Sequence, residues 1–455
     1  MTLWFETAFT GGEWADDVRI SHRDGVILSV ETGVPPRPGD ERGGAALPGL
    51  GNVHSHAFQR GMAGLAETQG GSGADSDSFW TWREVMYRFL GALDPDAVEA
   101  IAALAYAEML EAGFTRVGEF HYLHHAPDGR AYGNPAEMAC RLAAAAADTG
   151  VGLTLLPVFY AHGGFGGAPS GEGQRRFITT PDSFARLVEA SRAAVSPLSD
   201  AIVGVAPHSL RAATPEDIAR IAPLAAGGPV HLHIAEQVRE VADCLAFCGR
   251  RPVAWLFDQV PVDARWCLVH ATHVEPDELR LIAASGAVVG MCPITEANLG
   301  DGLFPAAAFR TMGGWFAVGS DSNVLIDAAE ELRTLEYGQR LAGRARNVLA
   351  SSARPSVGAS LFVGALAGGA QALGAGPATL SPGESLDLVC LDLGHPSLAG
   401  RRGDALLDSW IFAGRTGLVD GVWRRGRKVV SEGRHVRRRA IVERYRRALA
   451  RVLGA

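Results

Sequence analysis

Short apolar runs alternate with amphipathic stretches along most of the chain. Eight runs rich in Val, Ile and Leu have the length and composition of buried strands. They are Pro48–Val53, Thr115–Glu119, Gly152–Phe159, Ala201–Ala206, Pro229–His233, Trp266–Val269, Gly286–Gly290 and Phe316–Gly319. Alanine-rich segments with helical spacing lie between them, among them Asp94–Ala112, Pro181–Val195, Val238–Phe247 and Pro276–Ala284. This order predicts an α/β fold, a (β/α)8 TIM barrel with insertions.

The two ends of the chain have a different pattern, in which short strand-like runs are divided by glycine. We expect residues 1–47 and 376–455 to form one small β-sandwich domain, closed around a barrel of residues 48–375. The strand-like runs are Val18–Ile20, Gly25–Ser29, Asp387–Asp392, Asp408–Phe412 and Gly421–Val430, and a last helix is expected over Ala440–Leu453. The Gly-rich stretch His162–Gly173 lacks the ending of a phosphate-binding loop, so we interpret it as a mobile lid.

Composition narrows the class of protein. The 455 residues are 47% hydrophobic and 20% charged, which excludes disorder, and the net charge of −8 argues against a nucleic-acid partner. The N-terminus has no signal-peptide pattern, and no apolar run approaches the roughly 18 residues of a membrane span. Six cysteines are too sparse for a disulfide scaffold. We therefore expect a cytoplasmic protein with no membrane partner.

Polar side chains follow the carboxyl ends of the predicted strands, where a (β/α)8 barrel builds its active site. They include His54 and His56 after the first strand, His208 and Arg211 after the fourth, His233 and Glu236 after the fifth, His270 after the sixth and Asp321 after the eighth. Because side chains two apart on a strand share a face, His54 and His56 can bind the same ion. Three imidazoles and one carboxylate are typical of catalytic zinc, and Fe(II) accepts the same donors. We predict one divalent metal, with zinc favoured, bound by His54, His56, His233 and Asp321.

Two alternatives to this ligand set stay open. The histidines could be hydrogen-bonded core residues, although this would have to hold independently on several strands. His231 lies two residues before His233, so spacing alone does not separate them. We favour His233 because it lies nearer the strand end and leads into Glu236.

A divalent metal lowers the pKa of its water to about 7, which predicts a metal-bound hydroxide as the nucleophile. Glu236 is then the expected proton shuttle, taking a proton from water and delivering it to a leaving nitrogen. The alternative is a surface glutamate that opens a helix. His270 and Asp321 are expected to polarise the water or to stabilise developing charge, and their separate roles stay open.

With these residues located, the chain resembles the amidohydrolase superfamily over nearly its whole length. The shared pattern is HxH after strand one, HxxE after strand five, His after strand six and Asp after strand eight. The only lysine, Lys428, lies near the C-terminus, so none is available for the carbamylated bridge of binuclear members. The resemblance therefore implies a mononuclear enzyme that hydrolyses C–N bonds.

Within that superfamily, long segments resemble the formimidoylglutamate deiminase family of histidine degradation. They are LPGLGNVHSHAFQRGMAG, FWTWREVMYRF, GEFHYLHH and MCPITEANLGDGLFP, beginning at Leu47, Phe79, Gly118 and Met291. The resemblance implies that N-formimino-L-glutamate and water give N-formyl-L-glutamate and ammonia. It also implies a homodimer.

Such a substrate carries two carboxylates, which guanidinium groups bind in bidentate pairs. We expect Arg211 and Arg83 to bind them, and Gln59, Tyr122 and His208 to supply further hydrogen bonds. Arg83 lies among aromatic residues in a predicted helix, so it could instead only stack on them. His121, His124 and His125 are interpreted as loop residues, and Glu119 as a partner behind the ligands.

Two other functions compete with this prediction. An aminohydrolase acting on a purine or S-adenosylhomocysteine-like substrate would share the metal pattern, and Trp80 and Trp82 could stack on its base. A non-catalytic scaffold would be expected to have lost part of the ligand set, which is complete here.

Overall fold

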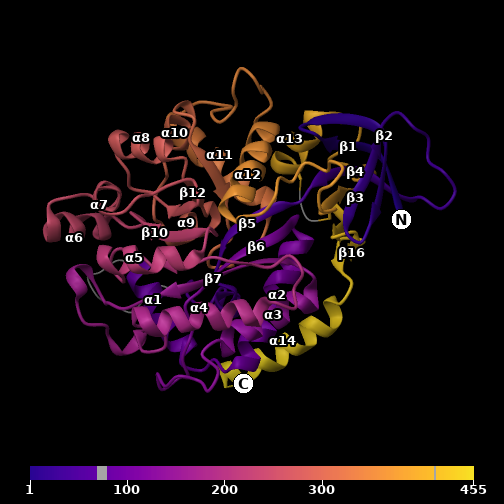
Figure 1. Cartoon of the computed structure of the whole chain (residues 1–455). Coiled ribbons are helices and arrows are strands. Elements are labelled where there is room, and N and C mark those ends of the chain that lie inside the picture. Colours follow the sequence, from indigo (N-terminus) through magenta and orange to yellow (C-terminus); the bar gives the residue numbers. More distant parts are fainter. Residues whose placement is uncertain (69–78, 415–416, 455) are drawn as a thin grey trace.

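The computed structural model describes residues 1–68, 79–414 and 417–454. Its central feature is a barrel of parallel strands surrounded by helices (Figure 1). The barrel strands are β5 (Leu50–Ser55), β6 (Phe114–His121), β7 (Gly152–Phe159), β8 (Ile202–Val203), β9 (Ala206–Pro207), β10 (Val230–Ile234), β11 (Trp266–His270), β12 (Val288–Met291) and β13 (Trp315–Val318). The predicted (β/α)8 fold is confirmed.

Isolated bridges close the barrel where the regular ladders stop. Strands β5 to β8 form one ladder and β10 to β13 another. The pairs Val205–Val230 and Ser209–His233 join them on one side, and Ser55–Asp321 joins them on the other. Since the last bridge contains Asp321 itself, the barrel closes at the predicted metal site.

The fourth strand was predicted as one run, Ala201–Ala206, and this is wrong in detail. It consists of two short strands, β8 and β9, which both pair with β7. Between them the chain approaches the next strand so closely that a Cβ on Gly204 would lie 2.4 Å from the Pro229 carbonyl oxygen. There the Val205 N–H donates to the Pro229 carbonyl oxygen at 3.1 Å, and the pairings with β7 lie on either side of this contact.

Local sequence signals explain where many helices begin. Asp94, Thr180 and Thr214 each accept a hydrogen bond from a backbone N–H in the first helical turn, and each precedes a proline. The helices are α1 (Phe79–Leu90), α2 (Pro95–Glu111), α3 (Glu137–Thr149), α4 (Pro181–Val195), α5 (Pro215–Ile221), α6 (Val238–Cys248), α7 (Pro252–Gln259), α8 (Pro276–Ser285), α9 (Pro293–Leu299), α10 (Ala306–Thr311), α11 (Ala328–Gly343), α12 (Val357–Ala372), α13 (Asp404–Phe412) and α14 (Arg438–Leu453).

Strands from both termini form the second part of the fold, beside the barrel (Figure 1). They are β1 (Thr2–Thr10), β2 (Glu13–Arg23), β3 (Val26–Glu31), β4 (Glu41–Pro48), β14 (Leu388–Leu391), β15 (Val419–Arg424), β16 (Arg427–Ser431) and β17 (Arg434–His435). The expected sandwich takes the form of one continuous sheet, in the order β17-β16-β15-β14-β4-β1-β2-β3. Antiparallel pairing of β4 with β14 unites the two termini.

One predicted strand of this region is a helix. Asp408–Phe412 belongs to α13, whose buried residues Leu406, Leu407, Trp410 and Ile411 recur at helical spacing. Five residues were too few to reveal that period. The helix packs against α11 and α12 rather than joining the sheet.

The last helix, α14, runs along barrel helix α2 (Figure 1). Arg438 pairs with Glu108 and Glu111 of α2 at 3.1 Å, so this arginine of α14 faces the barrel. Within the described residues, none of the helices combines the length and the apolar character that crossing a membrane requires.

Candidate metal centre and active site

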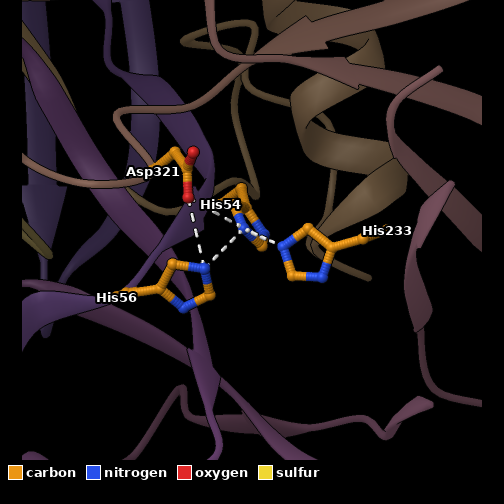
Figure 2. A group of neighbouring side chains, drawn as sticks. All are labelled: His54, His56, His233 and Asp321. Carbon is orange, nitrogen blue, oxygen red and sulfur yellow. Dashed lines mark hydrogen bonds and ion pairs between the residues drawn. The ribbon is translucent and has the colours of Figure 1, made fainter. Parts of the chain in front are cut away.

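Four buried side chains at the carboxyl end of the barrel point toward one another (Figure 2). His54 Nε2 lies 3.1 Å from His56 Nε2 and 3.0 Å from His233 Nε2. Asp321 Oδ1 lies 3.3 Å from His54 Nε2 and 3.2 Å from His56 Nε2. The structure thus brings together the four predicted ligands, although β5, β10 and the segment after β13 are far apart in sequence.

The chemistry of these donors fits a bound cation. Nδ1 of His56 donates to the Phe120 carbonyl oxygen at 3.0 Å, and Nδ1 of His233 donates to the His208 carbonyl oxygen at 3.0 Å. Since a carbonyl oxygen only accepts, the proton lies on Nδ1 and the lone pair of Nε2 faces the centre of the group. Burial lowers the pKa of His54 to about 3, which keeps that imidazole neutral as a ligand must be.

A buried amide network holds the ligands at the barrel seam. Asn323 Nδ2 donates to Ser55 Oγ at 3.1 Å, to the His56 carbonyl oxygen at 3.0 Å and to the Asp321 carbonyl oxygen at 3.1 Å. Its Oδ1 accepts from Ser320 Oγ at 2.6 Å. Asp321 and Asn323 have φ values of +43° and +55°, so the network keeps a strained turn in place.

Glu236 and His270 lie beside the four ligands. Glu236 Oε1 is 3.9 Å from His270 Nε2, which is also 3.9 Å from Asp321 Oδ2. Burial raises the pKa of Glu236, which favours a carboxyl that can hold a proton. Burial lowers the pKa of His270, but the carboxylates of Glu236 and Glu296 outweigh it and raise the pKa to about 10. The arrangement can hold and move protons next to the metal donors.

A pocket opens above these groups. Among its lining residues are Gln59, Arg83, Tyr122, His208, Arg211, Glu236 and His270. Gln59 Nε2 donates to the Tyr122 hydroxyl at 2.9 Å, and His208 packs edge-on against Tyr160 with ring centroids 4.6 Å apart. Every residue expected to contact the substrate therefore lies on the same cavity as the metal donors.

The two arginines of the pocket have different surroundings. Arg83 stacks on Trp80 at 4.4 Å and lies 5.6 Å from the Tyr87 ring, so the stacking proposed as an alternative is present while the side chain also lines the pocket. Arg211 is 12% exposed and lies 3.9 Å from carboxylate oxygens of both Glu236 and Glu240. Both guanidinium groups can reach a ligand in the pocket.

The other polar residues considered from sequence lie outside the cavity. His231 Nε2 binds the Ala372 carbonyl oxygen at 2.7 Å, two residues before His233 along β10 and away from the carboxyl end that carries the metal donors. His124 and His125 bind backbone carbonyl oxygens at 2.8 Å. Glu119 Oε1 accepts from the Ala57 N–H at 2.8 Å, behind His56.

Sequence reasoning missed several residues that shape the site. Glu296 on α9 accepts from His270 at 3.1 Å, and Tyr160 lines the pocket with its hydroxyl bound to Gln174 at 2.6 Å. Asn323 follows Asp321 by two residues, so its place in the sequence already indicates a position near the metal donors. Glu240 on α6 gave no signal beyond being acidic in a helix.

Comparison with known proteins agrees with this geometry. The sequence profile described as the amidohydrolase family matches residues 45–429. The chain belongs to the amidohydrolase family. Residues 4–44 match a second profile, described as the N-terminal domain of formimidoylglutamate deiminase HutF.

Individual relatives cover almost the whole chain. A formimidoylglutamate deiminase of Pseudomonas aeruginosa is 51% identical over 99% of this chain and 98% of its own length. A 5-methylthioadenosine/S-adenosylhomocysteine deaminase of Natronomonas pharaonis is 28% identical over 84% of this chain and 81% of its own.

Solved structures show the same architecture. An amidohydrolase from Brucella melitensis has a TM-score of 0.96 and 53% identity, covering 99% of both chains. An adenosine deaminase from Xanthomonas campestris with bound zinc has a TM-score of 0.82 and 24% identity, over 100% of this chain and 98% of its own, and this likeness concerns the fold alone. The four-donor group is thus the metal site of an amidohydrolase.

Proposed function

We propose that this amidohydrolase is a formimidoylglutamate deiminase, which hydrolyses N-formimino-L-glutamate to N-formyl-L-glutamate and ammonia in histidine degradation. One observation carries the proposal: the pocket that holds the metal donors and Glu236 also contains two arginines, Arg83 and Arg211. A small substrate with a hydrolysable amidine and two carboxylates matches that combination. The 51% identity to the Pseudomonas aeruginosa deiminase supports it.

We propose that His54, His56, His233 and Asp321 hold zinc. Three imidazoles, one carboxylate and room for a further ligand are the donor set of catalytic zinc, and the Xanthomonas campestris relative has zinc bound. A divalent cation at this position supplies Lewis acidity and lowers the pKa of a water molecule to about 7.

Proton transfer is assigned to Glu236 and His270. Glu236 is buried beside the ligands, and its raised pKa lets its carboxyl accept a proton from water and then release it. In the reaction the water oxygen bonds to the formimino carbon, and the bond from that carbon to the terminal nitrogen breaks. Glu236 delivers this proton and then the second proton of the water oxygen to this nitrogen, which leaves as ammonia while the oxygen becomes the formyl carbonyl. His270 and Asp321, 3.9 Å apart, orient the attacking water.

Substrate binding is assigned to the pocket wall. Arg211 is largely buried and lines the cavity, so it binds one carboxylate of the glutamate moiety. Arg83, held over Trp80, binds the other. Gln59, Tyr122 and His208 line the space between the arginines and the ligands and supply further hydrogen bonds.

A purine-type aminohydrolase is the second candidate. It is favoured by the 28% identity to the Natronomonas pharaonis deaminase and by aromatic residues of the pocket wall, among them Trp82 and Phe177. Two guanidinium groups facing the same cavity favour a dicarboxylate over a nucleobase.

A substrate panel separates the two candidates. Ammonia release is measured from N-formimino-L-glutamate, 5-methylthioadenosine, S-adenosylhomocysteine and adenosine, with the wild type and with Arg211→Gln. We expect turnover of N-formimino-L-glutamate only, with a raised KM in the variant. Turnover of a nucleoside, unaffected by Arg211→Gln, would favour the purine-type enzyme.

We further propose that the enzyme is homodimeric, as its family resemblance suggests, and cytoplasmic. We propose that it consists of a barrel of residues 48–375 and a β domain of residues 1–47 and 376–455. The single sheet that combines strands of both termini supports this division.

A further inference from the structure

One fully buried carboxylate, that of Glu240 in the first turn of α6, contacts both functional ends of the pocket. Its Oε1 accepts from the Ala235 N–H and its Oε2 from the Glu236 N–H, both at 3.2 Å. The same Oε2 lies 3.9 Å from Arg211 Nε. Glu240 is therefore bound to the backbone of the proposed proton carrier and placed against the proposed carboxylate-binding arginine.

The turn that Glu240 binds is a strained one. Ala235 has a φ of +49°, in the left-handed region that a residue with a Cβ rarely adopts. This turn separates the metal donor His233 from Glu236 and directs the Glu236 side chain back toward the pocket. Two successive N–H groups in such a turn form a small anion-binding concavity, which the Glu240 carboxylate occupies.

Arg211 is held by charge rather than by hydrogen bonds. Its Nε is buried and has no hydrogen-bond partner among the described residues. Oxygens of Glu240 and Glu236 both lie at 3.9 Å, which is within ion-pair range but too long for a hydrogen bond. The guanidinium thus lies on the pocket wall beside two carboxylates that attract it.

We propose that Glu240 is a positioning residue that couples substrate recognition to proton transfer, by fixing Arg211 and the backbone of Glu236 with one carboxylate. This inference rests on the proposed function for the roles of those two residues. Its alternative is that Glu240 only stabilises the turn, with no effect on the reaction beyond the amount of folded enzyme.

The chain contains a matched control for that alternative. Glu336 on α11 is also fully buried, accepts from the Val348 and Leu349 N–H groups at 2.9 Å, and pairs with Arg340 at 2.7 Å. It does not line the pocket. Glu336→Gln therefore makes the same chemical change in the same kind of site, away from the active centre.

The test compares Glu240→Gln, Glu336→Gln, Arg211→Gln and the double variant Glu240→Gln/Arg211→Gln. The glutamine side chain has one oxygen, so it can accept a hydrogen bond from only one of the two backbone N–H groups. Its NH2 group then faces the other N–H group, and two donors cannot bond to each other. We expect Glu240→Gln to raise KM and to lower kcat, each about tenfold or more, at unchanged metal content. In the double variant KM is expected to be little higher than in either single variant, since both substitutions weaken substrate binding through the same guanidinium, while the fall in kcat that comes from the Glu236 backbone remains.

Two results would overturn the inference. One is a Glu240→Gln enzyme with unchanged kcat and KM per folded molecule, as expected for Glu336→Gln. The other is an effect on KM that is fully additive with that of Arg211→Gln. Amide hydrogen exchange of residues 234–240 gives a readout independent of activity, and it should be faster in Glu240→Gln only. Inactivity of the wild type toward N-formimino-L-glutamate would refute the proposed function instead. Unchanged exchange in Glu240→Gln would still refute the inference in that case, since the carboxylate would then not hold the turn.

Discussion

Replacing Asn323 with alanine tests how the barrel seam holds the metal ligands. The fully buried amide makes four hydrogen bonds, one of them to the backbone of each ligand residue His56 and Asp321. At about 0.5–1.5 kcal/mol for each bond, their loss costs about 2–4 kcal/mol after partial relaxation. Alanine at a φ of +55° adds about 1 kcal/mol of backbone strain. We expect a total destabilisation of about 3–5 kcal/mol.

The same change should weaken metal binding. Partners behind metal ligands typically contribute about 10- to 100-fold in affinity, because they hold each donor in its binding orientation. Asn323 fixes two of the four donors, so we expect the dissociation constant to rise about 10- to 100-fold. Competition with a chromophoric chelator measures this constant, and urea unfolding measures the stability.

Asn298→Ala is the matched control, because this asparagine is exposed and donates to Glu67 away from the ligands. It should change stability by less than about 0.5 kcal/mol and leave metal affinity unchanged. A destabilised Asn323→Ala protein with the metal affinity of the wild type would refute the reasoning, since the network would then support the fold without orienting the donors.

Three further predictions address the substrate, the metal and the contact between the two parts of the fold. Arg211→Gln should raise the KM for N-formimino-L-glutamate about tenfold or more. Arg83→Gln should raise this KM less, because Arg83 is partly buried and stacks on Trp80. Steady-state kinetics of the two variants measure both changes in KM. Removing the metal with a chelator should abolish activity and lower the unfolding temperature, and adding zinc should restore both; an equally stable, active apoprotein would contradict the metal's role. Asp200→Asn should cost about 2–3 kcal/mol at pH 7 by leaving Arg424 without one of its carboxylate partners. Burial raises the pKa of Asp200, but Arg424 and Arg116 outweigh burial and lower this pKa. The ion pair therefore stabilises the fold above the ordinary pKa of 3.8, and this stabilisation is lost as the pH falls through the lowered pKa. Urea unfolding at neutral and at acidic pH should show that the cost of Asp200→Asn disappears in acid.

The strands and the four metal donors could be predicted because their signals are local. His54 and His56 are two apart on a strand, and His233 and Asp321 follow apolar runs whose ends meet on one side of a barrel. Prolines one residue after Asp94, Thr180 and Thr214 mark helix starts directly in the sequence. Where the run was too short to show a repeated helical period, as in the five residues of Asp408–Phe412, the prediction was wrong.

The residues that support the site could not be predicted in the same way. Glu240 and Glu296 are helical glutamates, and only the three-dimensional fold shows that they contact Glu236 and His270 instead of solvent. The split of the fourth strand depends on the close approach of Gly204 to Pro229, a contact between neighbouring strands. The substrate roles of Arg83 and Arg211 stay predictions, since their positions on the pocket are consistent with that role without testing it.

The most direct test of the account is to identify the products formed from N-formimino-L-glutamate by the zinc-loaded enzyme, with Glu236→Gln as the control. The account predicts equal amounts of N-formyl-L-glutamate and ammonia. It also predicts a fall of about 10²–10⁴-fold in kcat for Glu236→Gln at unchanged zinc content. A folded, zinc-replete wild type that releases no ammonia would contradict the proposed function, and a Glu236→Gln variant as active as the wild type would contradict the proton transfer assigned to Glu236.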